Sequence, residues 1–130
     1  MTKLSKDIKV GNSNTTLESL VPYVLYSNNS GENNITLNDN LKKYFRIDVV
    51  MRMIDGDNYE TITLYDPANR NWLYSRAESS ANNSSWYIFY QQYANTETTI
   101  TLTHNDLYVG HGGYHTNYNN EKIVKVIGYK

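Results

Sequence analysis

The sequence predicts an all-β domain, an antiparallel, jelly-roll-like β-sandwich of about eight short strands behind a short N-terminal connector. Apolar and β-branched residues alternate with polar residues over several short segments, as in strands with one buried face. Clusters of asparagine, glycine and serine, which favour turns, separate these segments. No long segment has the apolar spacing of an α-helix, so a parallel sheet with crossover helices is excluded.

Residues 1–21 form the expected connector, and residues 22–130 form the expected sandwich domain. Thr15 and Glu18 have the spacing of a capping box, which predicts the start of a helical turn. Pro22 cannot continue a helix, so the turn should end there and the domain should begin.

Two short strands, separated by a turn, are expected at the start of the domain. Tyr23–Tyr26 and Ile35–Leu37 consist of strand-favouring residues. The residues between them, 27–34, are rich in asparagine and serine and include a glycine, so we expect them to form the turn. A second turn is expected at residues 38–44, before the next strand.

The strongest expected strand is Phe45–Ile54. Apolar side chains alternate along it and define one face: Ile47, Val49, Met51 and Met53. Because Val50 and Ile54 add apolar residues to the opposite face, we expect a central strand that is largely buried on both faces. A tight turn at residues 55–58 leads into Tyr59–Tyr65, which should complete a hairpin.

Further strands are expected in the second half of the chain: 72–77, 85–93, 98–103, 107–109 and 122–129. In the last of these, strict alternation places four residues on one face: Ile123, Lys125, Ile127 and Tyr129. It places Val124 and Val126 on the other face. β-branched residues on both faces indicate a strand inside a sheet rather than a frayed tail.

Composition and charge exclude several classes of function. The 12 basic and 13 acidic residues are spread along the chain and give a net charge of −1, without the basic stripe that neutralises nucleic-acid phosphates. No apolar segment is long enough to span a membrane, and the N-terminus has no hydrophobic signal core. We therefore expect a soluble protein made in the cytoplasm. Without cysteine, disulfides, thiolate metal sites and cysteine nucleophiles are excluded.

No catalytic motif is present in the sequence, so we do not expect an enzyme. His104, His111 and His115 could each act as a base, but no serine lies in a nucleophile elbow. Acids in or beside strands could pair for glycoside hydrolysis, although solvated surface positions explain them more simply: Asp48, Glu60, Asp66 and Glu78.

His111 and His115 are the best candidate metal ligands. The glycines between them could fold the chain so that both histidines reach one ion, and a trimer could gather such histidines around its axis. The sequence assures no third ligand. An exposed binding or turn loop is therefore the preferred interpretation, and we expect neither a metal nor another cofactor.

Aromatic and amide side chains indicate the most specific function. The chain has 13 tyrosines against 2 phenylalanines, and residues 108–120 interleave tyrosine, histidine and asparagine with glycine. Aromatic rings stack on the apolar faces of sugars while polar side chains bond their hydroxyls, as in antibody loops rich in tyrosine and asparagine. The candidate glycan contacts are Tyr108, His111, Tyr114, His115, Tyr118 and Trp72. A turn without ligand explains the loop residues equally well, and a core or subunit interface explains the strand residues better: Trp72, Trp86, Ile88 and Phe89.

Several segments resemble, in the same order, the C-terminal β-rich domains of phage and prophage tail fibre and baseplate proteins. The final Lys-Val-Ile-Gly-Tyr-Lys is similar to the terminal strand of these domains. The other similar segments are Ile8–Asn12, Val24–Ser27, Ile35–Leu37, Tyr44–Arg52 and Tyr65–Asn69. The resemblance covers most of the first 70 residues and the last ten, and it offers no catalytic or binding residues to carry over.

The resemblance implies a virion component at the tip of a tail fibre or baseplate. Such a tip would form a homotrimer, contact other tail or baseplate proteins and bind host cell-surface polysaccharide without catalysis. One alternative is a purely structural tail subunit whose aromatic residues are buried between chains. A small carbohydrate-active enzyme with an unrecognised acid pair is the other.

Overall fold

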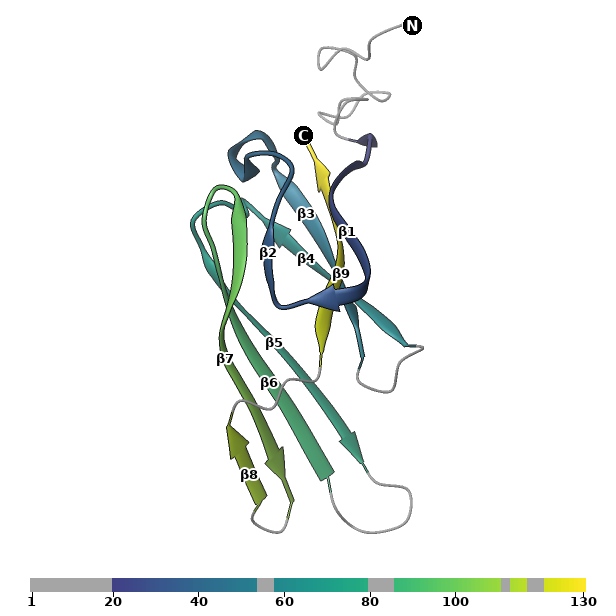
Figure 1. Ribbon diagram of the computed structural model, residues 1–130, viewed down its shortest axis with the longest axis vertical. Coiled ribbons are helices and arrows are strands. Elements are labelled where there is room, and N and C mark those ends of the chain that lie inside the picture. Colours follow the sequence, from purple (N-terminus) through teal and green to yellow (C-terminus); the bar gives the residue numbers. More distant parts are fainter. Residues whose placement is uncertain (1–19, 54–57, 80–85, 111–112, 117–120) are drawn as a thin grey trace, which may run out of the picture.

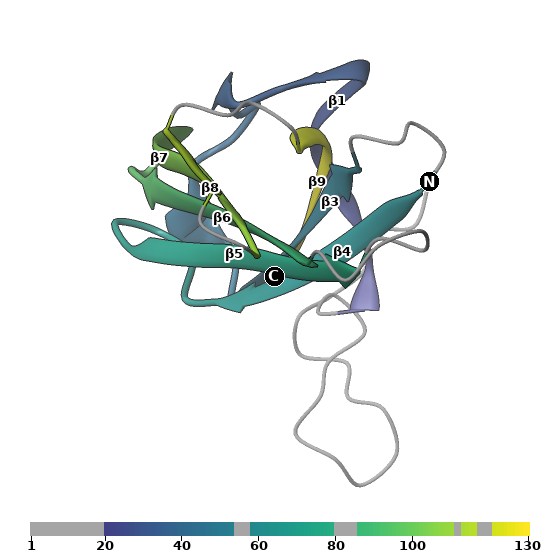
Figure 2. The same ribbon diagram turned by 90° about the horizontal axis from the view of Figure 1, so that it is seen from below.

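The computed structural model describes residues 20–53, 58–79, 86–110, 113–116 and 121–130. Within these ranges the chain forms two antiparallel sheets around one hydrophobic core, which confirms the predicted all-β sandwich (Figure 1, Figure 2). Nearly all of the expected connector lies outside the described residues. No helix in the described ranges is long and apolar enough to cross a membrane.

The first sheet has the strand order β1-β9-β3-β4, and the second has the order β2-β7-β6-β5, with β8 also pairing with β7. The ends of β5 to β8 extend beyond the first sheet (Figure 1). A 3₁₀ turn, η2 (Leu41–Lys43), follows β2. The strands are β1 (Tyr23–Glu32), β2 (Asn34–Thr36), β3 (Arg46–Arg52), β4 (Tyr59–Tyr65), β5 (Asn71–Ser79), β6 (Trp86–Asn95), β7 (Thr99–Val109), β8 (Gly113–Thr116) and β9 (Lys122–Tyr129).

Strand β3 is central, as its apolar composition predicts, because it lies between β9 and β4. Its predicted inner face is buried in the core: Ile47, Val49, Met51 and, just beyond the strand, Met53. The opposite face, which includes Asp48, Val50 and Arg52, is only half-buried. The expectation that both faces would be largely buried is therefore wrong, since the second sheet covers one side of β3 only.

Strand β9 contains a β-bulge that strict alternation does not anticipate. Ile123 pairs with Met51 and Lys125 pairs with Val50, so Val124 is an extra residue in β9. Ile123 consequently faces the core with no exposed surface, whereas Lys125 faces outward and is half-buried. The predicted grouping of Ile123 with Lys125 on one face is wrong for this reason.

Three other strands differ from the sequence prediction. Strand β1 continues through the expected turn at residues 27–34 as far as Glu32, with register shifts in its pairing to β9. Strand β7 is continuous where two short strands, 98–103 and 107–109, were expected. Strand β8 forms a hairpin with β7 inside the segment expected to be a loop.

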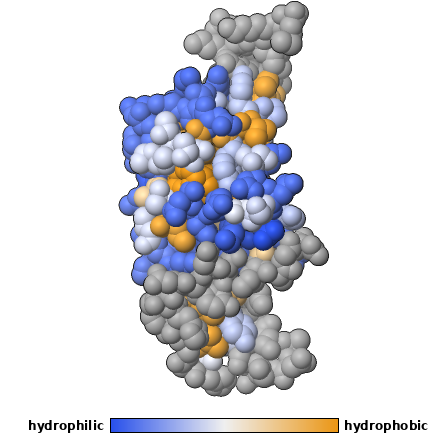
Figure 3. All heavy atoms as spheres, in the orientation of Figure 1, coloured by the Kyte–Doolittle hydropathy of each residue, from blue (hydrophilic) through white to orange (hydrophobic). Residues whose placement is uncertain are grey.

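Residues from both sheets fill the core, including Leu25, Val49, Val126, Trp72 and Tyr93. The indole of Trp72 stacks on the ring of Tyr93, with 4.4 Å between ring centroids and 13° between their planes. Most of the described surface is hydrophilic in the view of Figure 3, and hydrophobic residues form smaller patches there.

Candidate functional site

The second sheet turns one face to the core and the other to solvent. Because side chains alternate along β5 and β6, Trp72, Tyr74 and Tyr93 enter the core while the residues between them point outward. Strand pairing joins the outward residues in rows: Ala77–Ile88–Tyr108, Ser75–Tyr90–Asp106 and Leu73–Gln92–His104. The outer aromatic face is defined here as Leu73, Trp86, Ile88, Tyr90, Gln92, His104 and Tyr108.

Trp86 and Tyr108 give this face its most exposed aromatic rings, with 49% and 41% of their surface exposed. The indole of Trp86 lies against Gly110, where an added Cβ would be 2.6 Å from the indole Nε1. The Gly110 N–H also donates to the carbonyl of Trp86 over 2.7 Å. Only glycine allows the indole this close approach to the backbone, so Gly110 holds the ring over the end of β7.

A second β-bulge determines which way His104 points. His104 pairs with Gln92 and Leu102 pairs with Tyr93, so Thr103 is the extra residue in β7. Its hydroxyl donates to the Gln92 carbonyl over 3.0 Å. In an unbroken strand His104 would lie on the same face as Leu102, which packs against the core. The bulge moves His104 to the outer face.

His104 and Asp106 form a pair on this face. The imidazole Nε2 contacts the carboxylate Oδ2 of Asp106, which is 1% exposed, while half of His104 is exposed. The ring of Tyr90 meets the imidazole edge-on, with 6.0 Å between centroids. In the part of the chain that the structure describes, the imidazole Nδ1 has no hydrogen bond. Asp106 thus orients a histidine whose second nitrogen can bond a hydroxyl of a ligand.

The described residues do not assemble a nucleophile and a base. His104 makes no hydrogen bond to a hydroxyl among them. Three of the acids considered for glycoside hydrolysis lie apart: Asp48 accepts from Thr63 over 2.8 Å, Glu60 accepts from Tyr74 over 2.9 Å, and Asp66 follows β4. The side chain of Glu78 lies outside the described residues. No cluster of three or more potential metal ligands occurs in the described ranges.

The sequence-predicted contacts are only partly brought together. Tyr108 lies on the outer aromatic face, and Tyr114 and His115 lie in β8 at the register positions opposite Tyr108 and Leu107. Trp72 is 5% exposed and its indole N–H donates to Asn95 over 2.8 Å, so it belongs to the core rather than to a glycan-binding surface. His111 and Tyr118 lie outside the described residues.

Sequence reasoning missed several members of the outer aromatic face. Trp86 and Ile88 were assigned to a core or subunit interface; in the described structure they point outward beside Tyr90, which excludes the core for them, while the interface stays a prediction. The signal that could have found them is their spacing of two residues, which places them on one face of β6. His104 could not be found this way, because the bulge at Thr103 reverses its direction.

A buried polar network connects the two sheets. Glu121, which has no exposed surface and precedes β9, accepts hydrogen bonds from the Arg76 guanidinium over 2.7 and 3.2 Å. Its backbone carbonyl accepts from Asn33 over 2.7 Å and from Gln91 over 3.0 Å. The Arg76 guanidinium also lies 4.5 Å from the ring centroid of Phe89. These groups bond one another across the sandwich, which is a structural role.

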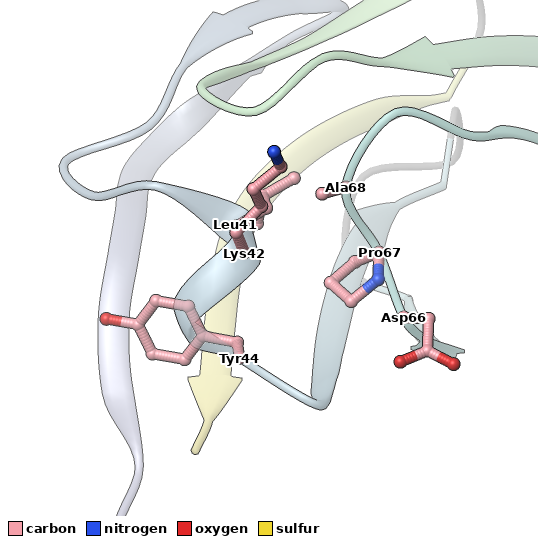
Figure 4. Close-up of a pocket in the computed structure, with 6 residues that line it drawn as sticks. All are labelled: Leu41, Lys42, Tyr44, Asp66, Pro67 and Ala68. Atoms are coloured by element: carbon pink, nitrogen blue, oxygen red, sulfur yellow. The ribbon is translucent and has the colours of Figure 1, made fainter.

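A small surface pocket of about 200 Å³ lies beside η2, lined by Leu41, Lys42, Tyr44, Asp66, Pro67 and Ala68 (Figure 4). It is smaller than typical ligand sites, which span about 300–1,000 Å³. Next to it, hydrogen bonds from Lys43 and Tyr44 lower the pKa of Asp39 to about 2. These polar groups stabilise η2 and the turn before it, so the outer aromatic face remains the better candidate site.

Comparison with known proteins adds no assignment. A scan against protein-family models finds no match, and a search of curated proteins finds no similar sequence. The function of the chain is therefore argued from its own surface.

Proposed function

We propose that this protein binds bacterial cell-surface polysaccharide without catalysing a reaction, as the receptor-binding tip of a phage or prophage tail fibre or baseplate. The main observation that supports this proposal is the outer aromatic face. Trp86 and Tyr108 offer rings for stacking on sugars, and Gln92 and His104 offer polar groups for their hydroxyls. A sheet face is also an open surface, along which an extended polymer can lie.

The chemistry of the site favours binding over catalysis. His104 is oriented by Asp106, but it faces the open surface rather than a closed pocket that excludes water. An exposed imidazole with one free nitrogen in the described structure can donate or accept a hydrogen bond. This property suits recognition of sugar hydroxyls.

The context of a tail tip rests on the sequence resemblance described above. Individual sugar contacts are weak, and a homotrimer would multiply them through avidity without any new contact. Neighbouring tail or baseplate proteins are the further partners that this role requires.

The proposal is tested by affinity electrophoresis in polysaccharide purified from bacterial surfaces. A stacked ring removes roughly 50 Å² of apolar surface from water, which is worth about 1.3 kcal/mol or nearly tenfold in affinity. Tyr108→Ala should therefore weaken binding about tenfold. Tyr65→Ala removes an even more exposed tyrosine, 58% against 41%, from the first sheet and should not weaken binding.

Light scattering on the same variants separates the alternatives. If Tyr108→Ala changes the molecular mass instead of the affinity, the residue lies between subunits and the structural role is favoured. Release of reducing sugar by the wild-type protein would contradict the non-enzymatic proposal. Repeating the mass measurement in EDTA shows whether a metal supports assembly.

A further inference from the structure

The outer face of the first sheet concentrates positive charge at one end. Arg52 of β3 lies directly opposite Lys122 of β9, and Lys125 lies opposite Val50 in the same pair of strands. On its other side Arg52 pairs with Tyr59, whose ring is exposed. The cationic corner is defined here as Arg52, Lys122 and Lys125.

The bulge at Val124 creates this corner. Lys122 and Lys125 are three residues apart, so in an unbroken strand they would point to opposite faces. With Val124 as the extra residue, both lysines lie on the outer face beside β3. Gly31 of β1 packs against the stem of Lys122, because a Cβ at Gly31 would be 2.7 Å from the Lys122 Cβ. The lysine stem is thus held in place while its charge remains available.

The charges of the corner have no counter-ions in the described structure. None of the three residues forms an ion pair within the described ranges, although all three are half-buried. Asp48, the acid of the same face in β3, lies two positions along the strand from Val50, and its ion-pair partner in the described structure is Arg46, with 3.8 Å between Arg46 Nε and Asp48 Oδ1. Glu32, the last residue of β1, pairs in register with Ile123 and makes no ion pair with a described residue.

Like charges directly opposite one another destabilise a sheet, because their side chains are only about 5 Å apart at Cβ. The net charge of the whole chain is −1, so this accumulation is local. An anion bound between the side chains would remove the repulsion. Arginine can bond a phosphate or carboxylate with two parallel N–H groups, and each lysine adds a point charge.

We propose that the cationic corner binds an anionic polysaccharide through its phosphate or carboxylate groups. The corner lies on the first sheet, whereas the outer aromatic face lies on the second. It is therefore a second binding site, in addition to the one in the proposed function. The choice of a polysaccharide rather than another polyanion rests on that function. Three cations within roughly 10 Å can hold two or three anionic groups, fewer than the 6–10 phosphate contacts of a typical nucleic-acid interface.

The test measures Kd for inorganic polyphosphate, polygalacturonate, single-stranded DNA and, as the uncharged control, neutral dextran over a range of salt concentrations. Lys122→Gln/Lys125→Gln should weaken binding of an anionic probe about tenfold or more and reduce the salt slope by about two, one for each lysine. The matched control is Lys42→Gln/Lys43→Gln, which removes two charges that already pair with Glu97 and Asp39. This control should bind like the wild type.

Binding of either anionic probe with this pattern supports the proposal, and the probe that binds shows whether phosphate or carboxylate is preferred. Equal loss in the two double variants would overturn it, since net charge alone would then explain binding. Failure to bind either anionic probe, or tighter binding of single-stranded DNA than of both, would also overturn it. Tyr108→Ala in the same assay reports separately on the outer aromatic face.

Discussion

Gly128 is the position at which the smallest substitution should have a large effect on folding. It lies in β9, opposite Ile47 of β3, on the face that packs against the core. A Cβ added there would be 2.5 Å from Cδ1 of Tyr44 and 3.0 Å from Cδ1 of Leu25. Both neighbours are buried, and the Tyr44 hydroxyl is held by Asp39 over 2.8 Å, so the ring has little freedom to move.

The size of the loss in stability follows from the short distance between the added Cβ and the Tyr44 ring. The shortest favourable non-bonded distance between two carbon atoms is about 3.5 Å, so the new methyl would be about 1 Å too close to the ring. Overpacking of this kind costs about 1–3 kcal/mol, and the loss of chain entropy in the unfolded state on replacing glycine offsets up to about 1 kcal/mol. Gly128→Ala should therefore lower the free energy of unfolding by roughly 1–2 kcal/mol.

Urea unfolding followed by tryptophan fluorescence measures this change, since the buried Trp72 reports on the core. The matched experiment introduces Gly128→Ala into a Tyr44→Ala background, where the ring is absent. There the substitution should be neutral or stabilising. Equal destabilisation in both backgrounds, or none in the wild type, would refute the proposed contact.

Three further predictions concern ionisable groups. Burial raises the pKa of three tyrosines, Tyr44, Tyr74 and Tyr93. Because unfolded tyrosine ionises near pH 10, stability should fall above about pH 10, and the absorbance change of these three among the 13 tyrosines should appear only as the fold is lost; ionisation of all 13 while the fold is intact would contradict this. Hydrogen bonds from Lys43 and Tyr44 lower the pKa of Asp39 from 3.8 to about 2, so its stabilising contribution should disappear as the pH falls from about 4 to 2. Asp39→Asn should flatten that part of the acid unfolding curve, and an unchanged curve would argue against the contribution. Glu121→Gln removes the buried carboxylate charge beside the Arg76 guanidinium and should cost roughly 3 kcal/mol in urea unfolding, whereas Glu97→Gln, at a side chain that is 41% exposed, should change stability little. A similar small effect at both positions would show that the buried pair is not important for folding.

The regular parts of the fold could be predicted from local sequence alone. In β3, apolar residues every second position identify the buried face, because the strand has no bulge in its own sequence and packs against a single core. Strand β1 was predicted too short, since its polar residues 27–32 are tolerated at the edge of the sheet, where only one neighbouring strand exists.

Bulges account for two of the features that the sequence did not predict, the outward directions of Lys125 and His104. The extra residues Val124 and Thr103 exist only relative to partner strands, so no local pattern marks them. Val124 brings Lys122 and Lys125 to one face, beside Arg52, which is 70 residues away in the chain. The cationic corner is for this reason invisible in a sequence whose charges are spread along its length.

Only part of the candidate site could be predicted from the sequence, because one of its residues depends on a bulge. Tyr108 could be identified from the aromatic content of its segment, whereas His104 depends on the bulge that precedes it. Trp72 and Trp86 have similar sequence surroundings, yet one stacks inside the core and the other lies on the surface. Only the pairing of β5 with β6 separates their roles.

The two tryptophans offer the most direct test of polysaccharide binding at the outer aromatic face. In a nuclear magnetic resonance titration with purified surface polysaccharide, the indole N–H signals of Trp86 and Trp72 report on the outer aromatic face and on the core. Binding at the outer aromatic face should shift the Trp86 signal with added polysaccharide while the Trp72 signal stays in place. An unchanged Trp86 signal under conditions where the polysaccharide is bound would contradict it.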